Sequence, residues 1–237
     1  MFIALPNLDG SFTGTLFLPF QGPLSFETLK TALDVESFFQ EQFPDAISLW
    51  AAPSHLSEEF QSNPTGHMVT VKCFPWSFQN PSGSQTLLMG DAAHAIVPFF
   101  GQGMNCGFED CTVLNQMLHL DSDLKSCFEK FSRQRKPDTD AIADLALENF
   151  IEMRDKVGNP KFILEKKVEA LLQKKFPQEY ISRYAQVTFS RVPYTKALSA
   201  GLIQNEILSE LCKGIKNEDE TDLNLAEKLI REKITSL

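Results

Sequence analysis

The sequence predicts an α+β fold in which short strands come first and helices follow. Before about residue 90, several short apolar or alternating segments are separated by turn residues, which is typical of strands. From Gly103 onward, apolar residues recur every three or four positions, which is typical of helices packed on a core. With 237 residues, the chain is long enough for one sizeable core or two modest domains.

The strand-rich part begins with a predicted hairpin. Phe2–Leu5 and Ser11–Leu18 form its strands, and Pro6–Gly10 forms the turn, in which Asp9-Gly10 is a common turn pair. A helix should follow, with Asp34 as its N-cap and Pro44 stopping it.

Two further strands are expected before the helical part. The residues from 51 to 66 are expected to form a loop, and His67–Cys73 to form a strand. Thr86–Met89 is interpreted as a short buried strand because it is apolar and ends abruptly at Gly90-Asp91.

The helical part is expected to contain six helices. Asn159-Pro160 is a good N-cap and first-turn pair, and Pro137 should separate two neighbouring helices because it cannot continue a hydrogen-bonded helix. The predicted ranges are 103–119, 122–135, 137–157, 160–176, 177–187 and 222–237.

Composition and charge exclude several classes of function. A net charge of −9 would repel nucleic-acid phosphates and anionic membrane surfaces, so neither is an expected partner. The N-terminal residues do not resemble a signal peptide, and no apolar run is long enough for a membrane span. The odd number of cysteines, five without a C-x-x-C pair, favours buried free thiols in a reducing cytoplasm.

The stretch from Leu87 to Asp110, LLMGDAAHAIVPFFGQGMNCGFED, is the best candidate for a site. A strand that ends in the Asp91 carboxylate suits a ribose or ribitol hydroxyl. The helix entry with Gly101 and Gly103 exposes amides that suit an electron-rich group. A flavin nucleotide carries both groups. The alternatives are a turn aspartate and a glycine-rich helix entry without a ligand.

Three other polar side chains, of Asn149, Tyr184 and His94, each have a plain structural interpretation. Asn149 shares a helix face with Leu145 and Met153, so its amide should be buried and need partners. Tyr184 has the spacing of a core tyrosine. His94 is expected to be structural, since the histidines show no metal-ligand spacing and no metal site is predicted.

The segment GDAAHAIVPFFGQGMN resembles the second flavin-binding segment of FAD-dependent aromatic monooxygenases of the para-hydroxybenzoate hydroxylase type. The segments IALPNLDGSFTGTLFLPF, ENFIEMR and VTFSR resemble, within that class, the kynurenine 3-monooxygenase family. The likeness runs from Met1 to about Tyr194 and implies the C-terminal half of such an enzyme. The N-terminal βαβ unit with its G-x-G-x-x-G loop would then be absent. Residues 1–85 would be part of a substrate-binding sheet, 86–120 the second FAD-binding segment, and 121–237 a C-terminal helical bundle.

The same resemblance assigns roles to individual residues. Asp91 would bind the sugar-like chain of FAD, and the backbone around the following helix start would face the flavin ring. Other residues would flank the substrate ring or hold its amino-acid end. The ring-facing residues would be Gly101, Gly103, Met104 and Asn105; the substrate residues would be Pro98, Phe99, Gln102, Asn149, Met153 and Tyr184, with Tyr194 as a weaker rival of Tyr184.

The activity implied by the resemblance is the hydroxylation of L-kynurenine to 3-hydroxykynurenine in tryptophan degradation, with FAD, NADPH and molecular oxygen. The flavin carries the chemistry, and the protein orients the substrate and excludes water. The chain by itself is expected to bind FAD weakly or not at all, to turn over nothing, and to self-associate through exposed apolar surface. The alternatives are a hydroxylase of another aromatic acid and a non-catalytic interaction module.

Overall fold

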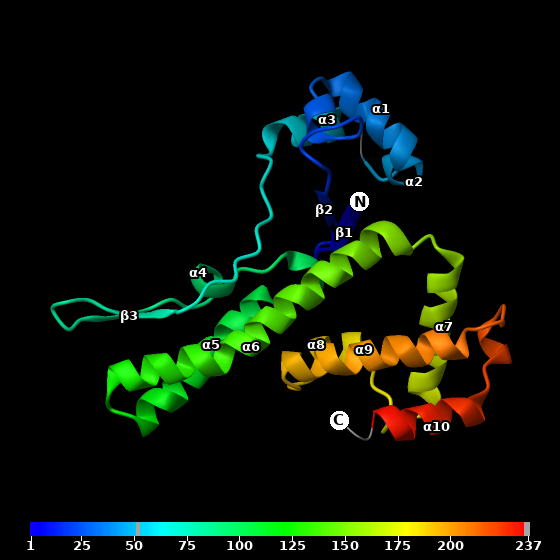
Figure 1. Cartoon of the computed structure of the whole chain (residues 1–237). Helices are drawn as coiled ribbons and strands as arrows, with labels where there is room; N and C mark the ends of the chain where they lie inside the picture. Colours follow the sequence, from blue (N-terminus) through cyan, green and yellow to red (C-terminus); the bar gives the residue numbers. More distant parts are fainter. Residues whose placement is uncertain (51–52, 235–237) are drawn as a thin grey trace. The chain divides into compact units, whose positions relative to one another are not determined.

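A computed structural model describes residues 1–50 and 53–234, and the chain divides into two compact units, Met1–His67 and Met68–Leu237. The structure is mostly helical, with two small antiparallel sheets (Figure 1). The coarse expectation of an α+β chain is therefore confirmed, although several helices come between the two sheets along the sequence.

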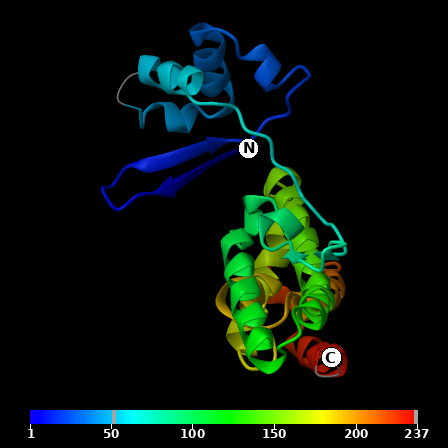
Figure 2. The same cartoon turned by 90° about the vertical axis from the view of Figure 1, so that its left-hand side faces the viewer.

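The first unit opens with the predicted hairpin. β1 (Phe2–Pro6) pairs antiparallel with β2 (Phe12–Leu16), as Figure 2 shows. In the turn, the Asp9 carboxylate accepts a hydrogen bond of 2.9 Å from the backbone amide of Ser11. This side-chain acceptor replaces a backbone partner, which is why aspartate favours such turns.

The helices of the first unit differ from the prediction in two places. The N-cap of α1 (Ala32–Gln42) is Thr31; Asp34 is wrong as the N-cap because it lies three residues later and completes a reciprocal capping box. Pro44 follows the end of α1 as expected, but it also begins α2 (Pro44–Ile47).

The loop predicted for 51–66 is also wrong, because α3 (Pro53–Ser62) occupies most of it; residues 51 and 52 lie outside the described residues. Leu56 and Phe60 are one helical turn apart and pack on α1, so burial of this face favours the helix. The core of the unit consists of Leu29, Val35, Phe38, Phe39 and Leu56.

The second unit begins without the strand predicted at His67–Cys73, so that prediction is wrong. The segment instead makes two backbone hydrogen bonds to the chain near α4: the Val71 amide donates to the Ala95 carbonyl oxygen (2.8 Å), and the Cys73 amide donates to the Ala93 carbonyl oxygen (3.4 Å). The second sheet instead joins β3 (Ser77–Gln79), which was not predicted, to β4 (Gln85–Leu87), which lies at the predicted short strand.

Two long helices follow the short turn helices α4 (Asp91–His94) and η2 (Pro98–Phe100). α5 (Gly103–Leu120) confirms its predicted range. α6 (Leu124–Ile151) runs without interruption through Pro137, so the predicted break there is wrong. α6 packs on α5 and on α9 (Tyr194–Leu211) and buries residues on both sides of Pro137. This burial outweighs the one lost backbone hydrogen bond. A π-helical turn, η3 (Glu152–Lys156), ends it.

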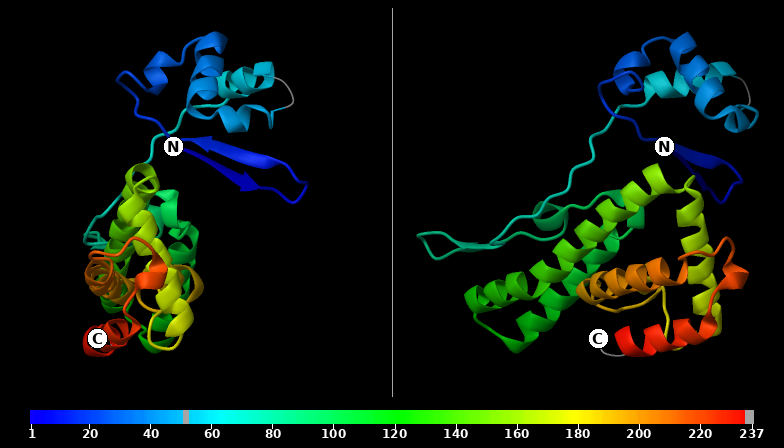
Figure 3. Two further views of the ribbon diagram at one scale, coloured as in Figure 1. Left: turned by 90° about the vertical axis from the view of Figure 1, so that its right-hand side faces the viewer. Right: turned by 45° about the vertical axis from the view of Figure 1, so that its right-hand side comes forward.

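The last helices pack around α9, as Figure 3 shows for α9 and α10. α7 (Pro160–Lys175) begins after its predicted N-cap, Asn159, and α10 (Leu223–Lys233) is capped by Asp222, the first residue of the predicted tail helix. Residues 235–237 of that predicted helix lie outside the described range.

The helix predicted from Pro177 is wrong at its start, because α8 spans Arg183–Phe189 and Ser182 caps it. α9 (Tyr194–Leu211) was not predicted, and a short η4 turn (Glu218–Glu220) separates it from α10. The core of this region consists of Val168, Leu172, Tyr180, Ile207, Leu208, Leu211, Cys212, Ala226 and Ile230. No helix within 1–50 or 53–234 is both long and apolar enough to cross a bilayer.

All five cysteines are free, but they are not all buried as expected. Cys106 and Cys111 both belong to α5, but Cys106 is buried and Cys111 is exposed. Burial raises the pKa of the Cys106 thiol to about 12, against the opposing effect of the nearby Arg135.

Because the thiolate is the reactive form, we expect iodoacetamide at pH 8 to label Cys111 first and Cys106 only in denaturant. Peptide mass spectrometry checks this order. Equal native labelling rates would contradict it, and Cys111→Ser should remove the fast site.

Candidate functional site

The Gly90-Asp91 turn follows β4 and begins α4. Gly90 has φ of +55°, a backbone conformation that glycine adopts without the strain imposed by a side chain. Asp91 is exposed at the start of α4. The turn therefore presents an accessible carboxylate directly after a strand, as the sequence predicted.

The start of α5 is open. Gly101, with φ of +66°, ends the η2 turn, and Gln102 is the N-cap of α5 but makes no side-chain capping bond. The backbone amide of Cys106 donates the first hydrogen bond of the helix, to the carbonyl oxygen of Gln102 at 2.9 Å. The three preceding amides, of Gly103, Met104 and Asn105, therefore have no acceptor within the helix. They carry the partial positive charge of a helix N-terminus and can bind an electron-rich group.

Gln102 is buried at this entry, and two side chains hold its amide. Its Oε1 atom accepts hydrogen bonds from Asn105 Nδ2 at 3.1 Å and from the Tyr194 hydroxyl at 3.2 Å. Tyr194, which the sequence ranked below Tyr184, is thus brought to the predicted site by α9. The sequence could not indicate this contact, because α9 was not predicted.

Asn149 lies against the loop that precedes α5. Its Nδ2 atom donates to the carbonyl oxygen of Phe99 at 2.7 Å and lies 3.7 Å from the sulfur of Met153. The Phe99 ring stacks on Phe150, with ring centroids 4.6 Å apart. The structure thus brings Phe99, Asn149 and Met153 together.

Tyr184 meets the same loop from α8. Its ring stacks on Phe100 at 5.8 Å between centroids, and it remains 52% exposed, which is more than a core tyrosine would be. Pro98 is exposed at the start of η2. The predicted substrate residues therefore gather around residues 98–102, with contacts from α6, α8 and α9.

A buried cluster of charged residues supports this region, and sequence reasoning missed it. Asp110 is fully buried and accepts hydrogen bonds from the Gly90 amide (3.2 Å), His94 Nε2 (2.5 Å) and Arg135 Nε (2.8 Å). Arg135 also forms an ion pair of 2.8 Å with Glu109. The one available signal was a carboxylate on the buried face of α5, one turn after Cys106.

This cluster contains a possible set of metal ligands, because donor atoms of His94, Cys106 and Asp110 lie within 4.8 Å of one another. However, the Arg135 guanidinium contacts both Asp110 and the Cys106 sulfur, the latter at 3.5 Å. A bound cation would face this positive charge, and the raised pKa of Cys106 keeps its thiol protonated. Ion pairing and hydrogen bonding account for the cluster without a metal.

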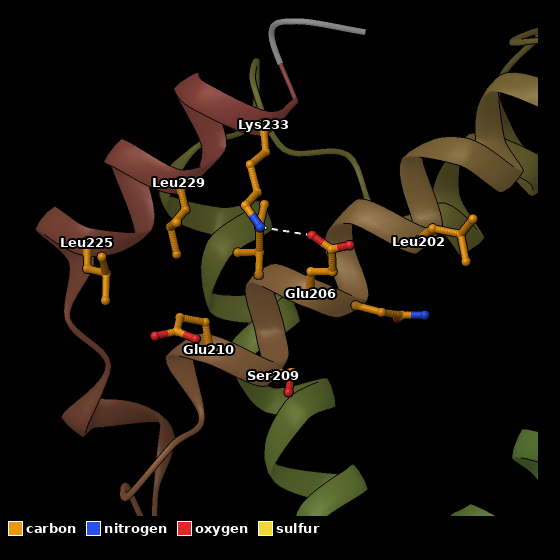
Figure 4. Close-up of a pocket in the computed structure, with 9 residues that line it drawn as sticks. Leu202, Glu206, Ser209, Glu210, Leu225, Leu229 and Lys233 are labelled. Carbon is orange, nitrogen blue, oxygen red and sulfur yellow. Dashed lines mark hydrogen bonds and ion pairs between the residues drawn. The ribbon is translucent and has the colours of Figure 1, made fainter.

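A surface hollow of about 600 Å³ lies between α9 and α10 (Figure 4). The ion pair between Lys233 and Glu206, at 2.8 Å, spans it, and Leu225 and Leu229 line its α10 side. None of the predicted site residues lines it, so we do not place the site there.

Comparison with known proteins relates this part of the chain to FAD-binding domains. Residues 77–146 match the family model of an FAD-binding domain, a range that contains the Gly90-Asp91 turn, the start of α5 and the buried cluster. The chain is 54% identical to a kynurenine 3-monooxygenase of Myxococcus xanthus over 99% of its length and 49% of the relative.

Two further relatives carry the same name. Those of Flavobacterium psychrophilum and Dictyostelium discoideum are each 48% identical over 98% of the chain and cover 51% and 52% of the relative. The chain spans about half the length of the curated relatives it matches. The resemblance predicted from the sequence is therefore confirmed, and it extends beyond Tyr194: 98–99% of the chain is similar to about half the length of these kynurenine 3-monooxygenases.

Proposed function

We propose that the chain forms the C-terminal half of an FAD- and NADPH-dependent monooxygenase that hydroxylates L-kynurenine on the ring carbon beside its aromatic amine. The observation that carries this proposal is 54% identity over 99% of the chain to a relative named for this reaction. The other predicted parts belong to the proposal as well: a partial substrate sheet at 1–85, a second FAD segment at 86–120, helices at 121–237, and a cytoplasmic location.

The residues present fit a flavin nucleotide. Asp91 is exposed and would hydrogen-bond a hydroxyl of the sugar-like chain, while the amides from Gly103 to Asn105 would bind the electron-rich edge of the ring. A bound FAD, once reduced by NADPH, would activate molecular oxygen for transfer of one oxygen atom to the substrate. Nothing lies within 4 Å of a side-chain carbon placed on Gly101, so the approach to this helix start is open on that side.

The chain would orient the substrate from the loop at residues 98–102. Pro98, Phe99 and Gln102 would flank the aromatic ring, and the packed aromatic side chains behind the loop would exclude water. Asn149, Met153 and Tyr184 would hold the amino-acid end. The Asn149 side-chain nitrogen donates to the Phe99 carbonyl oxygen and to the Met153 sulfur, so the amide oxygen is the atom that retains capacity for a ligand.

A hybrid protein tests the proposal. This chain would replace the matched portion of the Myxococcus xanthus relative, so that the remainder of that protein supplies the unmatched half. We expect the purified hybrid to be yellow, to oxidise NADPH faster when L-kynurenine is added, and to release 3-hydroxykynurenine detected by chromatography with mass spectrometry.

The chain alone, purified in parallel, is the control and should bind FAD weakly or not at all. Stimulation of the hybrid by a phenol or another aromatic acid, but not by L-kynurenine, would contradict the proposed substrate. A folded hybrid that retains no flavin would contradict the proposed cofactor role.

A further inference from the structure

We propose that Asp110 is a positioning residue for the flavin site, acting through the Gly90-Asp91 turn rather than by touching the cofactor. This inference rests on the proposed FAD-binding role of that turn. Asp110 and all its partners lie within the part of the chain that matches an FAD-binding domain.

Asp110 holds both ends of the turn. Its Oδ2 atom accepts from the Gly90 amide at 3.2 Å, directly before Asp91, and from His94 Nε2 at 2.5 Å, at the last residue of α4. Asp91 lies between these two anchored points. A single carboxylate oxygen therefore fixes the backbone that carries the proposed ribitol ligand.

The same helix also carries the open amides. Asp110 and Gly103 both belong to α5, so a rigid element connects the anchor of Asp91 to the amides that would face the flavin ring. Gly107, between them, lies against Gly90: a side-chain carbon placed on Gly107 would be 3.9 Å from the Gly90 Cα atom. The spacing between the two cofactor contacts is thereby set by α5.

The remaining partners keep the anchor charged. Arg135, buried on α6, donates to the Oδ1 atom of Asp110 at 2.8 Å. Burial alone would raise the pKa of Asp110, but the hydrogen bonds from His94 and Arg135 outweigh it and lower the pKa. An ionised carboxylate accepts stronger hydrogen bonds than a neutral one, so the Gly90 amide is held firmly.

Amide hydrogen exchange on the full chain tests the anchor directly. We expect Asp110→Asn to speed exchange of the Gly90 amide at least tenfold, because the neutral amide turns a donor toward Arg135 or His94. Core amides of α6, such as those of Ala143 and Leu145, should change little. Asp140→Asn, the same change at a half-buried carboxylate on α6 that pairs with Lys136, is the control and should leave Gly90 unaffected.

Two results would overturn the anchor: an unchanged Gly90 rate, or a Gly90 rate that rises by the same factor as the core amides. Should Asp110→Asn not fold, His94→Gln provides a second test. It should speed exchange at the amides of residues 93 and 94, which bond to the Gly90 carbonyl oxygen at 2.9 Å, and spare Gly90 itself. Unchanged exchange at residues 93 and 94 would again count against the anchor.

The effect on the cofactor is measured in the hybrid protein. Asp110→Asn should weaken FAD binding at least tenfold, followed by flavin fluorescence, while the KM for L-kynurenine stays within twofold. Equal FAD affinity with a loosened Gly90 amide would refute the positioning role. If the unmodified hybrid binds no FAD, the proposed function fails, and the exchange experiment still decides whether Asp110 anchors the turn.

Discussion

Replacing Arg135 by methionine is expected to lower the free energy of unfolding by about 3–5 kcal/mol, because it leaves a buried carboxylate without its cationic partner. Arg135 is only 3% exposed and pairs with Asp110, which is fully buried. Methionine retains much of the side-chain volume but offers no donor. Urea denaturation followed by circular dichroism at pH 7.5 measures the change.

The matched control is Arg133→Met, which makes the same substitution at an exposed position on the same helix. It should change the unfolding free energy by no more than about 0.5 kcal/mol. An Arg135→Met protein that loses less than 1 kcal/mol would mean that Asp110 finds another partner or takes up a proton at little cost. Combining Arg135→Met with Asp110→Asn should recover part of the loss, since the unpaired charge is then removed.

Gly201→Ala should also destabilise the protein, by about 1–3 kcal/mol, although alanine is the better helix former. The added methyl carbon would lie 2.3 Å from Cδ of Arg183. Arg183 cannot easily move, because it is buried and pairs with Glu148 at 2.6 Å and Glu152 at 2.9 Å. The overpacking therefore has to displace one of these groups, and thermal unfolding should show a lower Tm.

Two comparisons separate this clash from a general effect of alanine. Gly158→Ala places a methyl group where nothing lies within 4 Å, so it should be close to neutral. In an Arg183→Ala background the clash is gone, and Gly201→Ala should then stabilise α9 by up to about 1 kcal/mol through helix propensity. A destabilising effect of the same size in both backgrounds would contradict the assigned contact.

The elements that the sequence predicted well are those with local signals. Asn159-Pro160 and Asp222 begin α7 and α10 because a cap acts only on the next few amides. Thr31 and Asp34 could each be the N-cap from residue type alone, and only the reciprocal bonds decide between them. At Pro137 the local signal gave the wrong answer, since packing along α6 outweighs the missing donor.

The candidate site likewise has one part that local sequence features indicate and another part that depends on helix packing. The turn and the open helix start lie close together in the sequence, from Gly90 to Asn105, so their glycines and carboxylate could be recognised as one pattern. Asp110 and Arg135 are 25 residues apart, and Tyr194 and Gln102 are 92 apart. Such pairs depend on how helices pack: the periodicity of α5 places Asp110 on its buried face, but the sequence does not indicate which residue it pairs with.

The hydrogen bond from Tyr194 to Gln102 has a consequence for how this protein can evolve. It links the first turn of α9 to the loop at residues 98–102. The C-terminal helices therefore support, from outside the site, the residues proposed to contact the substrate. Substitutions along α9 or its neighbours can therefore tilt that loop without changing any residue within it. A preference for an aromatic compound of another shape can therefore evolve through substitutions in these helices as well as through substitutions of the proposed substrate residues.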